Sequence, residues 1–288
     1  MSDQFLDTPS DYIRFFLVGA DRASCWPFGA KHCPVRLAKP PAGLQGAPFE
    51  HDFQEIVGGE GALYRATRDK QSKVQLQVWV ADPRSSAWAR QQHSAWRESL
   101  GRGKETCRLY AVTRESGYWW LDVRLESISE ANYLDNYPGK IGETGEVVNF
   151  VSDQAFWRGF EELKTFDRET CRTAELVNRG DQPAWLRWTV TGQHDGIELG
   201  VGSEAVKLPK PDGTGNGYFI DTDEEWPALM DITGKDIQEQ HPRAYWRTPL
   251  PPRGQHRGNA VGLTIKPINP GADFRVEVAY TPRAEQAW

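Results

Sequence analysis

The chain has 288 residues, of which 39% are hydrophobic and 26% are charged, and its formal net charge is −6 at pH 7. A chain of this length can bury a full core, and we expect two domains. The acidic balance argues against a dedicated nucleic-acid-binding protein, whose contact surface should be basic. No apolar run approaches the roughly 20 residues of a membrane span, and the acidic, polar N-terminus is not a secretory signal. We therefore expect a protein that is made and assembled in the cytoplasm.

The four cysteines, Cys25, Cys33, Cys107 and Cys171, have neither a CxxC pair nor the spacing of a zinc site. Cys25 and Cys33 could form a disulfide across a short loop. For a cytosolic product, however, we predict reduced and partly buried thiols.

The first part of the chain is predicted to consist of strands and loops. Residues 12–18 are typical of a strand, and the Pro/Gly-rich segment 26–43 predicts an irregular loop. Residues 62–67 and 74–80 predict a hairpin around the polar turn 68–71, because apolar residues alternate in the second segment.

A helix is predicted over 83–100. Asp82 is a good N-cap residue, Pro83 suits the first helical position, and Gly101 stands where a helix stops. One face of this helix is predicted to hold Trp88, Gln92, Ala95, Trp96, Ser99 and Leu100.

A second hairpin, 108–113 with 119–128, follows the helix, and 147–151 predicts a strand leading into a short helix at Ser152-Asp153. The order strand, hairpin, helix, hairpin indicates a β-domain with one packed helix. We place this N-terminal domain at 1–165 and a C-terminal domain at 166–288.

The C-terminal domain is predicted to be a β-sandwich. Ala184, Leu186, Trp188 and Val190 alternate with other side chains after the turn-forming segment 178–183. Further short strands are predicted at 204–208, 218–221, 260–265 and 274–280, and many short strands between regular turns are typical of a sandwich.

The remaining motifs are predicted to be structural. The tripeptide Arg179-Gly180-Asp181 lies in a turn, the acidic residues of 221–225 lack the spacing of an EF-hand, and the Pro-rich segment 249–253 is a rigid loop before a strand. The sequence contains no nucleophile elbow, zinc-protease helix, P-loop or dinucleotide fingerprint. Acids such as Glu161-Glu162 could converge in space as in glycosidases, but we expect no enzyme, and no cofactor or metal.

The segment Asn-x-Gly-Asp-x-Pro, an aromatic strand and Thr-Gly, residues 178–192, resembles the C-terminal half of distal tail proteins. These are the baseplate hub, or minor tail, proteins of long-tailed non-contractile bacteriophages, especially those of actinobacteria. The resemblance extends over most of the chain and is carried by GALYR, VQLQVWV, CRLYAVTRESGYWWLDVRL, FVSDQAFWRG, LVNRGDQPAWLRWTVTG and GYFIDT. The later loop reads Pro-Pro-Arg-Gly, a mild departure from the family's Pro-Pro-Gly-like loop.

The resemblance implies a mainly β fold, with an N-terminal ring-forming domain and a galectin-like or carbohydrate-module-like C-terminal sandwich. It implies a homo-oligomer, a hexameric ring at the virion tail tip, that joins the tail tube protein to the hub or tail-associated protein and to tail fibre or receptor-binding proteins. Six copies would carry 6 × −6 = −36 formal charges, and a negative lumen would repel passing DNA rather than bind it.

Twelve tryptophans are many for this length. Aromatic side chains on strands supply core and subunit contacts, and we predict Trp79, Trp88 and Trp96 at the oligomer interface. The alternative is a monomeric sandwich that binds host-wall polysaccharide, with Trp185 and Trp226 stacking on sugar rings. A wall hydrolase is a third class, for which we expect no activity.

Overall fold

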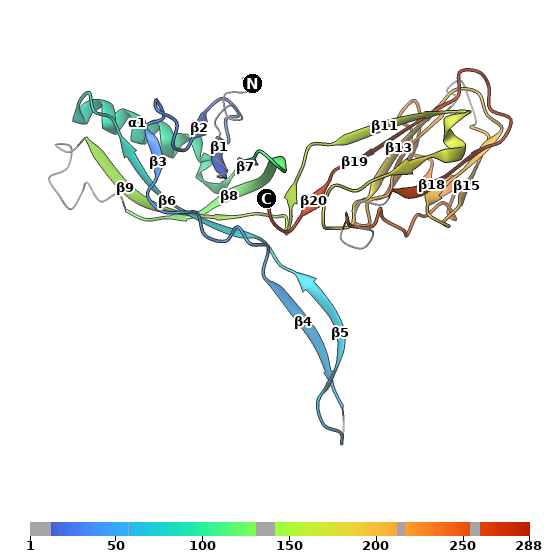
Figure 1. The fold of residues 1–288 in the computed structure, drawn as a ribbon, viewed down its shortest axis with the longest axis horizontal. Helices are drawn as coiled ribbons and strands as arrows, with labels where there is room; N and C mark the ends of the chain where they lie inside the picture. Colours follow the sequence, from blue (N-terminus) through green and yellow to red (C-terminus); the bar gives the residue numbers. More distant parts are fainter. Residues whose placement is uncertain (1–12, 57, 131–141, 212–216, 254–259) are drawn as a thin grey trace. The chain divides into compact units, whose positions relative to one another are not determined.

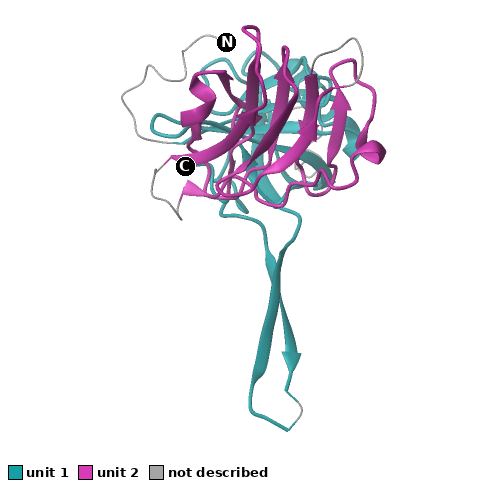
Figure 2. Cartoon of the chain, turned by 90° about the vertical axis from the view of Figure 1, so that its right-hand side faces the viewer, with its two compact units in different colours: residues 1–158, 285–288 teal, residues 159–284 magenta. Residues whose placement is uncertain are grey.

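The computed structural model describes residues 13–56, 58–130, 142–211, 217–253 and 260–288. The chain divides into two compact units: unit 1 is Met1–Arg158 with Glu285–Trp288, and unit 2 is Gly159–Ala284 (Figures 1 and 2). A boundary between 165 and 166 would cut strand β11 (Glu162–Asp167), which lies wholly in unit 2. This strand is difficult to predict because only Phe166 among its residues is buried, so it lacks apolar alternation.

Unit 1 is built on one antiparallel sheet with the strand order β2-β1-β7-β8-β9-β6-β3, and β10 pairs with β8. Alternate residues of β6 face the core, as predicted, because Val74, Leu76, Val78 and Val80 are buried. The predicted hairpin at 108–128 is confirmed as β7 paired with β8. The strands of the sheet are β1 (Arg14–Val18), β2 (Cys25–Pro27), β3 (Val35–Leu37), β6 (Lys73–Ala81), β7 (Cys107–Thr113), β8 (Gly117–Ile128), β9 (Glu143–Val151) and β10 (Trp157–Arg158).

Helix α1 (Ser86–Ser99) packs against β6 and β9. It begins later than predicted: Ser85, not Asp82, is the N-cap, and its hydroxyl accepts a hydrogen bond from the Trp88 amide. The Asp82 carboxylate instead forms an ion pair with the Arg84 guanidinium, at 2.6 Å. The stop at Gly101 is confirmed, because its φ of +63° is left-handed backbone that favours glycine.

The buried face of α1 is turned by one residue from the prediction. It consists of Ala89, His93, Trp96 and Ser99, so Trp88 is exposed. After β9, residues 152–156 form bends rather than the predicted short helix. The Ser152 hydroxyl accepts a hydrogen bond from the Gln154 amide, a turn contact that takes the place of a helix cap.

The predicted pairing of 62–67 with 74–80 is wrong. Strand β5 (Ala62–Asp69) pairs with β4 (Phe49–Glu55), whereas β6 pairs with β3 and β9 (Figure 1). Ser72, between β5 and β6, is buried, and its carbonyl accepts a hydrogen bond from the Ser152 amide. The polar segment before β6 is therefore attached to the end of β9, and it is not a hairpin turn.

Unit 2 contains two antiparallel sheets (magenta in Figure 2). The five-stranded sheet has the order β11-β19-β13-β16-β17, and the four-stranded sheet has the order β12-β18-β14-β15. Beyond β11, the strands of unit 2 are β12 (Glu175–Leu176), β13 (Leu186–Thr191), β14 (Gly196–Val201), β15 (Val206–Pro209), β16 (Gly217–Asp221), β17 (Ala228–Asp231), β18 (Val261–Pro267), β19 (Arg275–Tyr280) and β20 (Arg283–Ala284).

Both sheets of unit 2 contribute to one hydrophobic core. Trp188 and Val278 come from the five-stranded sheet, and Leu199 and Ile265 come from the four-stranded sheet. This arrangement is a β-sandwich, and with unit 1 it confirms a mainly β protein. The predicted turn after β12 is organised by Asn178, whose amide group donates to the Gln182 carbonyl and whose side-chain oxygen accepts from the Gly180 amide.

Candidate interaction surfaces

The described part of the chain contains no group of three or more His, Cys, Asp or Glu side chains that could hold a metal ion. Within the same residues, no helix has the length and apolar character needed to cross a membrane. All four cysteines are free thiols, Cys25 exposed and the others buried.

The β4–β5 hairpin carries exposed apolar side chains along its length. Every residue of the two strands is exposed except Ala66, which is half-buried. A β-bulge between Asp52 and Phe53 shifts the pairing so that Phe53 lies opposite Tyr64. An isolated two-stranded hairpin is at best marginally stable in water, so this element needs a partner surface.

One side of this hairpin is a stripe of rings, which we call the aromatic face: Phe49, His51, Phe53 and Tyr64. The ring centroids of Phe49 and His51 are 5.1 Å apart, and those of Phe53 and Tyr64 are 6.0 Å apart. Phe49, His51 and Phe53 share this side because alternate residues of a strand point the same way. Phe53 is 55% exposed and Tyr64 is 54% exposed, so the aromatic face is an exposed apolar surface of the kind that proteins cover in assemblies.

The sequence prediction missed the aromatic face because residues 49–55 were not recognised as a strand. The signal was present, since apolar or aromatic residues occupy positions 49, 51 and 53, and Gly58, Gly59 and Gly61 follow. Two short alternating runs around a Gly-rich segment are typical of a hairpin.

The three tryptophans predicted at an oligomer interface lie in different environments. Trp79 is exposed on β6 beside Gly145 of β9, which has no side chain to cover the ring. Trp88 is exposed on α1, with the Arg84 guanidinium carbon 3.9 Å from the centre of its ring. Trp96 is fully buried inside unit 1 and cannot itself touch a partner, which corrects the prediction for this residue.

Trp96 belongs to a buried polar cluster that fixes α1 to the sheet. Its indole N–H donates to Glu146 Oε1 at 2.7 Å, while His93 and Arg97 contact Oε2, each at 2.9 Å. Burial raises the pKa of Glu146. The hydrogen bond from His93 and the charge of Arg97 lower it by more than burial raises it, so the pKa lies below its usual value of 4.5. Glu146 is therefore a buried, paired carboxylate with a structural role.

The two tryptophans predicted to contact glycan lie at the same end of strands β13 and β16. The Thr222 amide donates to the Leu186 carbonyl, which joins the start of β13 to the end of β16. Trp185, directly before β13, is half-buried, whereas Trp226, in the turn between β16 and β17, is 81% exposed. Trp226 is thus available for stacking.

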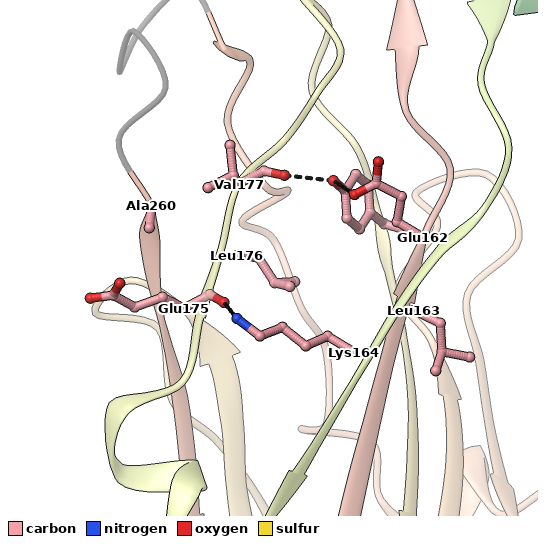
Figure 3. Close-up of a pocket in the computed structure, with 8 residues that line it drawn as sticks. Glu162, Leu163, Lys164, Glu175, Leu176, Val177 and Ala260 are labelled. Carbon is pink, nitrogen blue, oxygen red and sulfur yellow. Dashed lines mark hydrogen bonds between the residues drawn. The ribbon is translucent and has the colours of Figure 1, made fainter. Parts of the chain in front are cut away.

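A groove of about 310 Å³ runs between β11 and β12, the edge strands of the two sheets of unit 2 (Figure 3). Three of its polar side chains are paired with neighbouring residues. The Tyr280 hydroxyl contacts Glu162 Oε2 at 2.7 Å and the Val177 carbonyl at 2.5 Å, and Lys164 donates to the Glu175 carbonyl at 2.8 Å. The Tyr280–Val177 and Lys164–Glu175 contacts join the five-stranded sheet to β12 and the residue after it, so the groove has a structural explanation.

Comparison with known proteins gives a likeness at the level of the fold. No protein-family model and no curated protein matches the sequence. Among solved structures, the chain is similar to Dit (gp 19.1) of phage SPP1, described as a paradigm of the hub adsorption apparatus in phages infecting Gram-positive bacteria. That match has a TM-score of 0.63 and 12% identity, and covers 94% of this chain and 99% of Dit.

Two structures of the activated phage P2 baseplate, one with Ca and one with Sr, each contain a similar chain. Both matches have a TM-score of 0.55 and 12% identity, and cover 96% of this chain and 99% of the other. The likeness to distal tail proteins predicted from the sequence is thereby confirmed for the fold. Over the matched 94–96% of its length, this chain has a fold similar to those of SPP1 Dit and of a phage P2 baseplate chain.

Proposed function

We propose that this chain is a structural distal tail protein of a bacteriophage. In this proposal, copies of the chain form a ring at the tail tip, joining the tail tube to the hub and fibre proteins and leaving a lumen for DNA. The observation that carries the proposal is the fold match, which spans nearly the full length of both this chain and SPP1 Dit. The proposal includes six subunits, assembly in the host cytoplasm and an actinobacterial host.

The exposed surfaces of unit 1 support self-association. The aromatic face of the hairpin and Trp79 are different patches of one chain. A contact between unlike patches of neighbouring copies is heterologous, and it closes into a ring when the rotation per copy suits. The aromatic face of one copy and the sheet surface around Trp79 of the next are a pair of patches that would meet in this way.

The first test is the mass of the purified protein by light scattering, with negative-stain images of the same sample. We expect a hexamer and a six-fold ring with a central hole. A monomer at every concentration, even when mixed with purified tail tubes, would contradict the ring.

Trp79→Ala is expected to shift the measured mass from ring towards monomer while the monomer still folds, because part of the Trp79 side chain, 38%, is exposed on its sheet. The matched control is Trp226→Ala in unit 2, which should leave the mass unchanged. An unchanged mass with a lowered melting temperature for Trp79→Ala would overturn its interface role.

A second candidate function is binding of host-wall polysaccharide by unit 2, which the exposure of Trp226 favours. The protein should then be retained on host cell walls, and Trp226→Ala or Trp185→Ala should reduce retention. Neither proposal includes catalysis, so incubation with host walls should cause no loss of turbidity.

A further inference from the structure

His194 lies in the turn that carries the chain from β13 to β14, and therefore from one sheet of unit 2 to the other. Backbone hydrogen bonds tie this turn to the segment before β19. The Asp195 amide donates to the Ile268 carbonyl at 2.8 Å, and the Gly271 amide donates to the Gln193 carbonyl at 2.7 Å. The turn thus closes one end of the sandwich core.

The imidazole of His194 points into that core. The side chain is 1% exposed, and its ring centroid is 5.8 Å from that of Phe274 and 6.0 Å from that of Tyr218. Neither ring nitrogen has a well-formed hydrogen bond to a described residue. The Tyr218 hydroxyl donates to the Pro209 carbonyl instead. A protonated ring in this place would be a buried cation without a hydrogen-bonded counter-ion, which is costly.

The charged groups around the turn are already paired with other residues. Asp195 holds Lys210 at 3.1 Å and the Asn269 amide group at 3.0 Å, and Asp273 accepts from the Gln193 amide. Burial lowers the pKa of His194 below its usual 6.5; the Gly196 backbone and the Asp195 charge offset part of this effect, and Lys210 adds to it.

We propose that His194 is a pH-sensitive latch: the neutral imidazole seals this end of the sandwich, and protonation expels it and opens the turn. The open turn binds the proton more readily than the closed one. Opening is therefore rare above pH 6.5 and becomes more frequent as the pH falls below 6.5.

The test is amide hydrogen exchange of Asp195 and Ile268 in the full-length protein, corrected for the intrinsic pH dependence of exchange. From pH 7.5 to pH 5.5 we expect the opening equilibrium to rise by up to about tenfold. His194→Phe, which keeps a ring beside Phe274, should abolish this rise. His241→Phe, at a half-buried histidine of the same unit, is the matched control and should retain it.

An NMR titration of the His194 ring in the unaltered protein provides a measurement that needs no variant. A midpoint below 6.5, together with a corrected opening equilibrium at Asp195 that rises as the pH falls below 6.5, supports the latch. A midpoint at or above 6.5, or a corrected opening equilibrium that does not change with pH, overturns it. These outcomes do not depend on whether the chain forms a ring.

Discussion

Glu146 on β9 accepts hydrogen bonds from three residues of α1, and its side chain has no exposed surface. A buried carboxylate is costly unless charged and hydrogen-bonding groups surround it. Here Arg97 supplies the charge, at 2.7 Å, and donates as well to the Ser129 carbonyl. The same contact thus fixes the position of the helix and satisfies the carboxylate.

Glu146→Gln should lower the free energy of unfolding of unit 1 by about 3 kcal/mol, because Arg97 loses its buried counter-ion. Since folding lowers the pKa of Glu146, its stabilising contribution is present above pH 4.5 and is lost as the pH falls towards the folded pKa. Urea unfolding at pH 7 and pH 4 measures both effects, and the difference between variant and wild type should shrink at pH 4.

The control is Glu143→Gln, at an exposed position of the same strand, for which we expect a change within about 0.5 kcal/mol. Equal effects of the two substitutions would mean that the buried cluster does not hold the helix.

At the scale of elements, β4 and β5 are the part of unit 1 without a core of their own. Their side chains are exposed, whereas β6, next in the sequence, buries every second residue. We therefore expect a partner surface to stabilise the hairpin by covering its aromatic face.

Phe53→Ser should reduce the oligomer mass measured by light scattering, because it removes the centre of the aromatic face, and should leave the unfolding transition of the monomer within about 0.5 kcal/mol. Gln54→Ser, one residue further on and on the opposite side of the strand, should change neither quantity. If both variants associate as the wild type does, the aromatic face is not an assembly surface.

Elements with a buried face were predictable from the sequence, and elements without one were not. β6, β8 and β13 follow from apolar alternation, because the core selects every second side chain. The start of α1 was misplaced because Asp82 and Ser85 are both suitable caps, and the ion pair with Arg84 occupies the first. β6 pairs with β9, which is distant in the sequence, so the local pattern could not show that β5 pairs with β4.

The candidate surfaces were less predictable than the fold. The sequence predicted Trp79, Trp88 and Trp96 at one interface. In the structure, Trp88 and Trp96 lie on different faces of α1, so Trp88 is exposed and Trp96 is buried. Whether an aromatic side chain is exposed depends on which face of its helix or strand packs against the core. An error of one residue in assigning that face exchanges buried and exposed positions.

At the scale of the whole molecule, unit 2 has a hydrophobic core whose residues all come from within unit 2. The fragment 159–284 should therefore fold alone and unfold in urea as one cooperative transition, as expected of an independent domain. Circular dichroism and dispersed amide signals would measure this. A fragment that stays unfolded or aggregates would show that unit 2 needs the rest of the chain.

The chain enters unit 2 after Arg158 and returns to unit 1 at Glu285, and Ala287 is fully buried there. Unit 2 is therefore an insert with two covalent junctions, not an appendage on a single tether. A protease that cuts one junction leaves both halves of the molecule joined. In evolution, another β-sandwich domain could replace unit 2 between the same two junctions, and both segments of unit 1 would be retained.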